Sequence, residues 1–123
     1  MNTPFDPTLL TATEWRLASY GPLDPPTPAA AEQTATLRFG SDGRISGSTG
    51  CNRLIGSYEA QGDLIHFKPL AMTRMACPNP ALQQQEAEIS AALQGSLRYE
   101  LDAGTLRIFY GSDNSMLRYV AAN

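Results

Sequence analysis

Residues 47–58 read Gly-Ser-Thr-Gly-Cys-Asn-Arg-Leu-Ile-Gly-Ser-Tyr, and the rest of the chain is organised around this stretch. It holds three glycines, an asparagine and one of the chain's two cysteines. Glycine is favoured where the backbone adopts positive φ, or where a Cβ atom would collide with a neighbour. The stretch therefore predicts a shaped corner between strands, not a flexible linker.

The second cysteine ends the segment Thr73-Arg74-Met75-Ala76-Cys77. A disulfide between Cys51 and Cys77 would close the loop between them, which is worth about 3.6 kcal/mol on the chain-entropy argument. That is a large share of the stability of a small domain. The alternative is two free thiols in a reducing cytosol. We favour the disulfide, which requires an oxidising compartment; free thiols would point to a cytoplasmic protein.

Short strands are predicted on both sides of the corner. The Asp42-Gly43 step is a strong hairpin signal between two apolar stretches. Trp15 is the first expected core residue, because it begins an alternating apolar pattern. The expected strands are residues 13–20, 34–39, 44–47, 54–59, 64–68, 96–101, 105–110 and 116–121.

One segment has the pattern of a helix. Asn79 is a suitable N-cap and Pro80 a suitable first helical residue, so we expect a helix near residues 80–94. Its apolar stripe consists of Leu82, Ile89 and Leu93. Such a helix is expected to pack against a sheet or to cover the end of a barrel.

Eight short antiparallel strands and one helix predict a mainly β (α+β) fold. We expect a small closed or half-open antiparallel β-barrel, since closure protects sheet edges. A two-sheet sandwich is the alternative. The length of 123 residues, with 42% hydrophobic and 17% charged residues, indicates one globular domain. We place that domain at residues 13–123, after a disordered segment at residues 1–12.

The net charge and the hydropathy of the chain limit the classes of partner that we expect. Nine Lys and Arg against twelve Asp and Glu give a net charge of −3, and the basic residues are scattered along the chain. This pattern predicts no nucleic-acid partner, and no apolar run is long enough for a transmembrane segment. A monomer is expected. The first residues do not resemble a secretion signal, so either the protein is cytosolic or a leader has been removed.

No residue pattern predicts a catalytic site, a cofactor or a metal. His66 is the only histidine, so any Ser-His-Asp or Cys-His mechanism would depend on it, and its strand position predicts an ordinary exposed side chain. Cys51, His66 and Cys77 would supply three zinc ligands, but they lack the paired spacing of zinc sites. Glu86 and Glu88 project from different sides of the helix, and we expect solvated or capping charges.

Three arginines, Arg98, Arg107 and Arg118, share one face of the last three strands. We favour a solvated face balanced by Glu100 and neighbouring acids over an anion-binding surface.

A family resemblance rests on the following motifs: Trp15-x-Leu17, Asp42-Gly43-Arg44-Ile45-Ser46-Gly47, Gly50-Cys51-Asn52-Arg53 with Gly56-x-Tyr58, and Leu70-Ala71-x-Thr73-Arg74-Met75-Ala76-Cys77. In this order they resemble the META domain family of HslJ-like heat-shock proteins, from Trp15 nearly to the end of the chain. The resemblance implies a small antiparallel β structure with a helix, and no enzymatic activity or cofactor.

The resemblance also implies a role. Family members look like exported proteins or lipoproteins of the cell envelope, linked to heat shock and novobiocin tolerance. We therefore expect a non-enzymatic periplasmic or outer-membrane-associated protein, acting as an interaction or structural module with an unknown envelope component. A small-ligand-binding barrel protein is the alternative. The motif residues expected to be structural are Gly47, Gly50, Asn52, Arg53, Gly56, Tyr58 and Thr73, with Cys51 and Cys77 as the disulfide.

Overall fold

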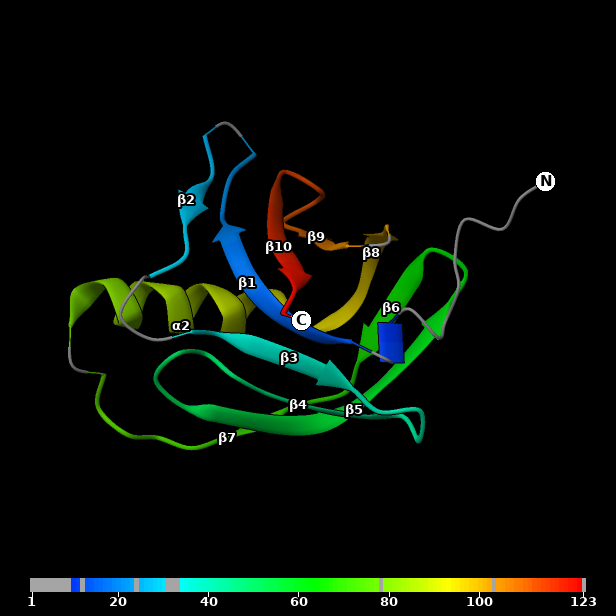
Figure 1. Cartoon of the computed structure of the whole chain (residues 1–123), viewed down its shortest axis with the longest axis horizontal. Helices are drawn as coiled ribbons and strands as arrows, with labels where there is room; N and C mark the ends of the chain where they lie inside the picture. Colours follow the sequence, from blue (N-terminus) through cyan, green and yellow to red (C-terminus); the bar gives the residue numbers. More distant parts are fainter. Residues whose placement is uncertain are drawn as a thin grey trace.

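The structure is a computed structural model that describes residues 10–11, 13–23, 25–30, 34–77, 79–102 and 104–122. Its strands are β1 (Glu14–Tyr20), β2 (Thr27–Pro28), β3 (Thr36–Phe39), β4 (Arg44–Ser48), β5 (Arg53–Gln61), β6 (Leu64–Phe67), β7 (Ala71–Met72), β8 (Gly95–Leu101), β9 (Thr105–Tyr110) and β10 (Ser115–Ala121). The helix α2 spans Pro80–Ala92 (Figure 1).

Eight strands form a closed antiparallel barrel. Their order is β1-β3-β4-β5-β6-β8-β9-β10, and β10 pairs back with β1, with Trp15 opposite Ala121. Figure 1 shows β1 and β10 side by side. The predicted barrel is thus confirmed in its closed form, and the sandwich alternative is wrong. The two-residue strands β2 and β7, which the sequence does not predict, pair with β1 and β5.

The Asp42-Gly43 hairpin joins β3 to β4 as predicted. Phe39 lies opposite Ile45 in the register of the two strands. Gly43 has a φ of 85°, in the left-handed region that favours glycine. The hairpin is also tied to β5, because the Tyr58 hydroxyl donates a hydrogen bond to the carbonyl of Gly40 at 2.7 Å.

The barrel interior is filled with apolar side chains from its strands. Because successive side chains of a strand alternate between its two faces, each strand contributes every second residue. The largest contributors are Trp15, Leu37, Phe39, Ile45, Leu54, Ile65, Phe67, Leu106, Ile108, Leu117 and Tyr119, all at most 2% exposed. Burial of each such side chain stabilises the fold by roughly 2 kcal/mol. Leu97 of β8 is only partly buried.

Of the expected disordered segment 1–12, only residues 10 and 11 are described. The Leu10 side chain is 2% exposed and packs in the core. Its carbonyl accepts a hydrogen bond from the Trp15 indole N–H at 3.1 Å. The indole N–H is therefore satisfied inside the protein, as a buried Trp requires.

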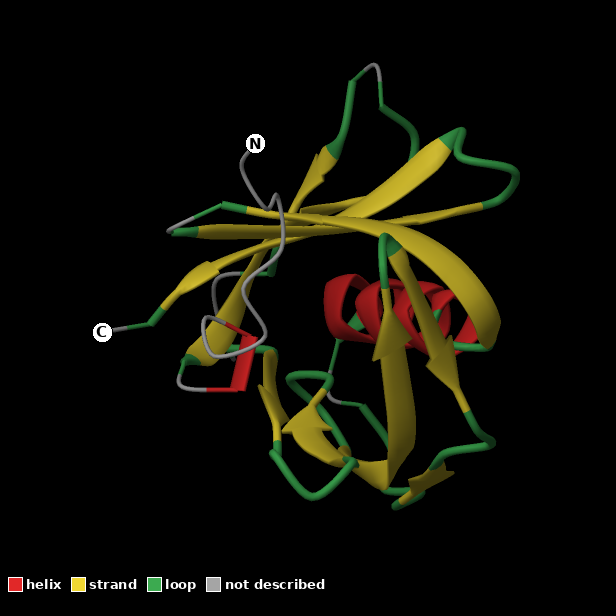
Figure 2. Ribbon diagram, turned by 90° about the vertical axis from the view of Figure 1, so that its right-hand side faces the viewer, coloured by secondary structure: helices red, strands yellow, loops and turns green. Residues whose placement is uncertain are grey.

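Helix α2 begins where the sequence predicts. Asn79 has an extended backbone, and its Oδ1 accepts a hydrogen bond from the amide of Leu82 at 2.9 Å. The buried side of the helix consists of Leu82, Gln85, Ile89 and Ala92. Figure 2 shows strands of the barrel on more than one side of α2. No helix in the described ranges has the length and apolar character needed to cross a membrane.

Candidate functional site

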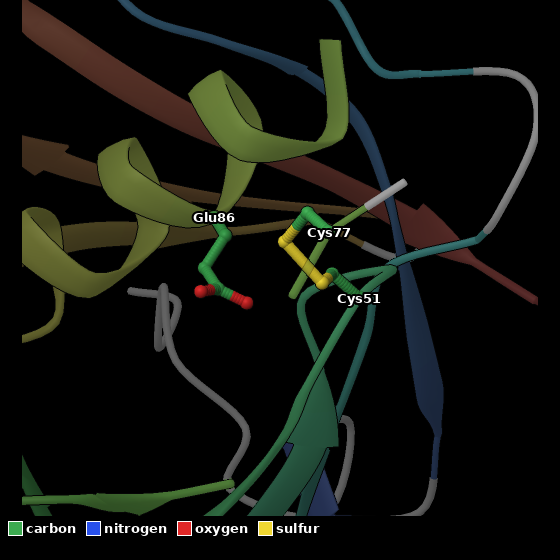
Figure 3. Close-up of side chains that lie close together, drawn as sticks. All are labelled: Cys51, Cys77 and Glu86. Carbon is green, nitrogen blue, oxygen red and sulfur yellow. A yellow bond between two sulfur atoms is a disulfide. The ribbon is translucent and has the colours of Figure 1, made fainter. Parts of the chain in front are cut away.

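Cys51 and Cys77 form a disulfide, which confirms the favoured pairing. Their Cα atoms are 5.5 Å apart, a normal separation. Cys51 belongs to the corner between β4 and β5, and Cys77 lies just before the start of α2. The bond therefore joins the corner to the entry of the helix. Glu86 of α2 directs its carboxylate toward the two sulfur atoms (Figure 3).

Asn52, next to the disulfide, is 1% exposed. Its side-chain amide donates to Met75 O at 3.0 Å and to Glu86 Oε1 at 2.7 Å. Its Oδ1 accepts from the Thr73 hydroxyl at 2.9 Å and from the Met75 amide at 2.7 Å. An Asn side chain offers two donors and an oxygen with two lone pairs, so Asn52 is fully satisfied within the protein. It connects the corner, the 73–77 segment and the helix.

Thr49, also in the corner, completes the link to Glu86. Its side chain is fully buried, and its hydroxyl donates to Glu86 Oε1 at 2.9 Å. The Thr49 hydroxyl oxygen in turn accepts a hydrogen bond from the backbone amide of Asn52 at 2.9 Å. The prediction that Glu86 is a solvated or capping charge is therefore wrong: the helix packs over the corner and places this half-buried carboxylate among donors. We call Thr49, Asn52, Thr73, Gln85 and Glu86 the polar hub.

The prediction that Glu88 is a solvated or capping charge is also wrong. Its Oε2 accepts a hydrogen bond from the Tyr110 hydroxyl of β9 at 2.6 Å. The carboxylates of Glu86 and Glu88 thus fasten α2 to two separate parts of the barrel, the corner and β9.

Gln85 is the hub residue that the sequence interpretation missed. It is fully buried; its amide donates to Thr49 O at 2.7 Å and its Oε1 accepts from the Ala30 amide at 2.7 Å. The available signal was its position, three residues after Leu82 and four before Ile89, which places it on the apolar stripe. A glutamine at such a position must find partners inside the protein.

The three glycines of the corner each meet a geometric demand. Gly50 has a φ of 93°. A Cβ atom at Gly47 would collide with the carbonyl oxygen of Thr36, and one at Gly56 with the side chain of Leu70. The corner is thus shaped by the absence of side chains.

Thr73 and Arg53 fix the 73–77 segment to β5 through the backbone. The Thr73 hydroxyl accepts from the Arg53 amide at 3.0 Å, and the Thr73 amide donates to Arg53 O at 3.0 Å. The Arg53 residue is exposed.

The three side chains that the sequence analysis weighed and rejected as zinc ligands, Cys51, His66 and Cys77, are only partly brought together. The sulfur atoms of Cys51 and Cys77 and a carboxylate oxygen of Glu86 lie within 4.8 Å of one another, and His66 is not part of this group. A metal ligand sulfur must be a thiolate, which a disulfide does not offer. His66 is exposed on β6, and its Nδ1 lies 2.9 Å from the hydroxyl oxygen of Ser96 on β8.

Two of the three arginines of the last strands are engaged with acids. Arg98 contacts Asp113 and Glu100, each at 3.0 Å, and lies over the Phe109 ring at 4.0 Å from its centroid. Arg107 pairs with Asp102 at 3.0 Å. Arg118 lies opposite Arg107 in the register of β9 and β10. The ion pairs of Arg98 and Arg107 with acids fit the balanced face expected from the sequence.

Comparison with known sequences yields one family and one named relative. The profile of the family described as META domain matches residues 8–123. The chain is 38% identical over 72 residues to "Heat shock protein HslJ" of Escherichia coli (strain K12). The aligned region covers 58% of this chain and 51% of that protein. The chain thus spans about half the length of the curated relative it matches.

Solved structures share the fold. One protein solved by NMR is 29% identical, with a TM-score of 0.77 and 96% of both chains covered. A protein from Burkholderia xenovorans, also solved by NMR, is 26% identical, with a TM-score of 0.76 over 100% of this chain and 92% of the other. A DUF4847 family protein from Bacteroides vulgatus ATCC 8482 matches with a TM-score of 0.65 at 14% identity, covering 90% of this chain and 93% of that one. This last match concerns the fold alone.

Proposed function

This chain belongs to the META domain family, and from that membership we propose that it is a non-enzymatic protein of the cell envelope, periplasmic or outer-membrane-associated. In this proposal it acts in the heat-shock and envelope-stress response, including tolerance of novobiocin. Its molecular role is that of a rigid interaction or structural module for another envelope protein or component.

The disulfide is the observation that carries the proposal. Structural disulfides persist in oxidising compartments such as the bacterial periplasm and are rare in the cytosol. The Cys51–Cys77 bond joins the corner to the entry of α2, beside the hub that fastens the helix. The name of the Escherichia coli relative supports the heat-shock part.

The hydrogen bonding of the hub side chains within the protein supports the non-enzymatic part of the proposal. Hydrogen bonds to other groups of the protein are formed by the side chains of Asn52, Thr49 and Gln85. Satisfied buried networks rigidify a structure. A rigid barrel with an anchored helix is suited to presenting a fixed surface to a partner.

The location is tested by thiol labelling in the native cell. The protein is alkylated in denaturant with and without prior reduction, and then analysed by mass spectrometry. We expect Cys51 and Cys77 to be labelled only after reduction, and the protein to fractionate with the envelope. Free labelling of both thiols without reduction would contradict the envelope location.

The stress role is tested with a deletion strain. We expect the strain to lose survival at high temperature and in novobiocin. Wild type should restore survival, and so should Gln84→Ala, a control on the exposed side of α2. The double variant Cys51→Ser/Cys77→Ser should restore it less. Unchanged survival of the deletion strain would contradict the stress role.

A further inference from the structure

A groove of about 450 Å³ lies between α2 and the residues that lead from β6 through β7. Ligand-binding pockets are commonly of a few hundred to a thousand Å³. The groove reaches down to core side chains, so its floor is apolar. The floor residues are Leu54, Phe67, Ile89 and Leu93, each at most 2% exposed.

The rim of the groove includes polar side chains and one full charge. Arg74 is the charged residue of the lining, and no Asp or Glu belongs to it. Arg74 is exposed, and the ion pairs found among the described residues do not include it. His66 also lines the rim. Since its Nδ1 is already close to Ser96, Nε2 is the nitrogen left for a ligand.

We propose that this groove binds a small amphipathic carboxylate. The carboxylate contacts the guanidinium of Arg74, because an arginine fork holds a carboxylate through two parallel hydrogen bonds. The alkyl or aryl body lies on the apolar floor. A cationic ligand would find no acid in the lining, and a polyanion would find a single arginine. The site differs from the barrel interior, which side chains fill. The proposal goes beyond the stress role and does not depend on it.

Octanoate is the probe. It is titrated into purified ¹⁵N-labelled protein below its micelle-forming range, in parallel with 1-octanol and octyltrimethylammonium. We expect octanoate to shift the amides of groove residues and to bind about tenfold more tightly than octanol, since a charge-assisted hydrogen bond is gained. The cationic probe should bind no better than octanol.

Two arginine variants test whether octanoate binding needs the charge of Arg74. Arg74→Gln should reduce octanoate binding to the level of octanol. Arg44→Gln is the control, because Arg44 is also exposed but lies on β4, outside the groove lining. It should leave octanoate binding unchanged. Equal binding of octanoate and octanol by the wild type, or equal losses in both variants, would overturn the proposal.

A third variant tests whether the probe binds in the groove. Ser90 is an exposed α2 residue on the rim, so Ser90→Trp should fill the groove and abolish binding of both probes without unfolding the protein. Amide shifts that persist in this variant would locate the probe elsewhere and refute the site. Vesicles of phosphatidylglycerol test the other source of an amphipathic anion, a membrane. Sedimentation with vesicles that depends on Arg74, together with no octanoate shifts, would refute a free ligand.

Discussion

Asn52 illustrates how much one buried polar side chain can hold in place. It is 1% exposed, and four of its side-chain hydrogen bonds reach residues 73, 75 and 86. The cost of losing Asn52 therefore includes the partner groups that would be left without these hydrogen bonds.

Replacement of Asn52 by Ala is expected to lower the free energy of unfolding by about 3 kcal/mol. It would remove one of the two hydrogen bonds to Glu86 Oε1, leaving the one from Thr49, and would take away the side-chain partner of both backbone groups of Met75. Urea unfolding of the oxidised protein measures the change. Gln84→Ala, on the exposed side of α2, should stay within about 0.5 kcal/mol of wild type. A loss below about 1 kcal/mol for Asn52→Ala would show that the hub tolerates its removal.

The residue-level predictions succeeded where the local pattern was sufficient. The N-cap at Asn79 and the hairpin at Gly43 depend on neighbours a few positions away. Glu86 and Glu88 were misjudged because their partners Asn52 and Tyr110 lie 34 and 22 positions away. Periodicity tells which side of a helix is apolar, but it does not tell which polar side chains meet another element.

At the scale of elements, alternation located the eight strands of the barrel because each has one buried face. The strands β2 and β7 have two residues each and form where β1 and β5 offer backbone partners. No local signal marks them. The link between the corner and α2 was predicted only through its cysteines, while the hub beside it was not.

Reduction of the disulfide is expected to lower the free energy of unfolding by about 3.6 kcal/mol, because the unfolded chain gains the freedom of the opened loop. The hub would still hold the corner to α2 in the folded state. Urea unfolding with and without a phosphine reductant measures the difference. The Cys51→Ala/Cys77→Ala variant is the control, since the reductant should not affect it. Equal stability of the wild type in both conditions would contradict a stabilising disulfide.

At the scale of the whole molecule, the barrel and helix enclose the aromatic side chains. The chain has five tyrosines. Burial is the main cause that raises the pKa of each above the usual 10.0, and for Tyr110 the hydrogen bond to Glu88 raises the pKa further. The Tyr119 hydroxyl is fully buried and has no hydrogen-bond partner among the described residues.

These raised pKa values predict alkaline unfolding. The folded protein holds its phenolic protons to higher pH than the unfolded chain, so this contribution to stability is complete below about pH 10 and is lost as the pH rises further. Phenolate absorbance should therefore appear together with the loss of near-ultraviolet circular dichroism. In urea the same phenols should titrate near the ordinary value. Titration of all five near pH 10 in a protein that remains folded would contradict the prediction.

The sequence did not decide whether the barrel is closed or half-open. Alternation shows which face of a strand is buried, but not which strand is its neighbour. The pairing of β1 with β10 joins segments about a hundred residues apart, and it includes the hydrogen bond from the Ala122 amide to Glu14 O at 2.9 Å. A half-open barrel with the same strands would show the same sequence pattern.

The pairing of β1 with β10 also fixes the order in which parts of the nascent chain can fold. A ribosome or an export channel delivers β1 before β10, so the barrel cannot close until β10 has emerged. Both cysteines emerge before β8 and can meet sooner. Meanwhile one edge of β1 has no β10 beside it and is free to pair with another chain. In a crowded cell, that interval is when the unpaired edge of β1 is exposed to misassembly with other chains.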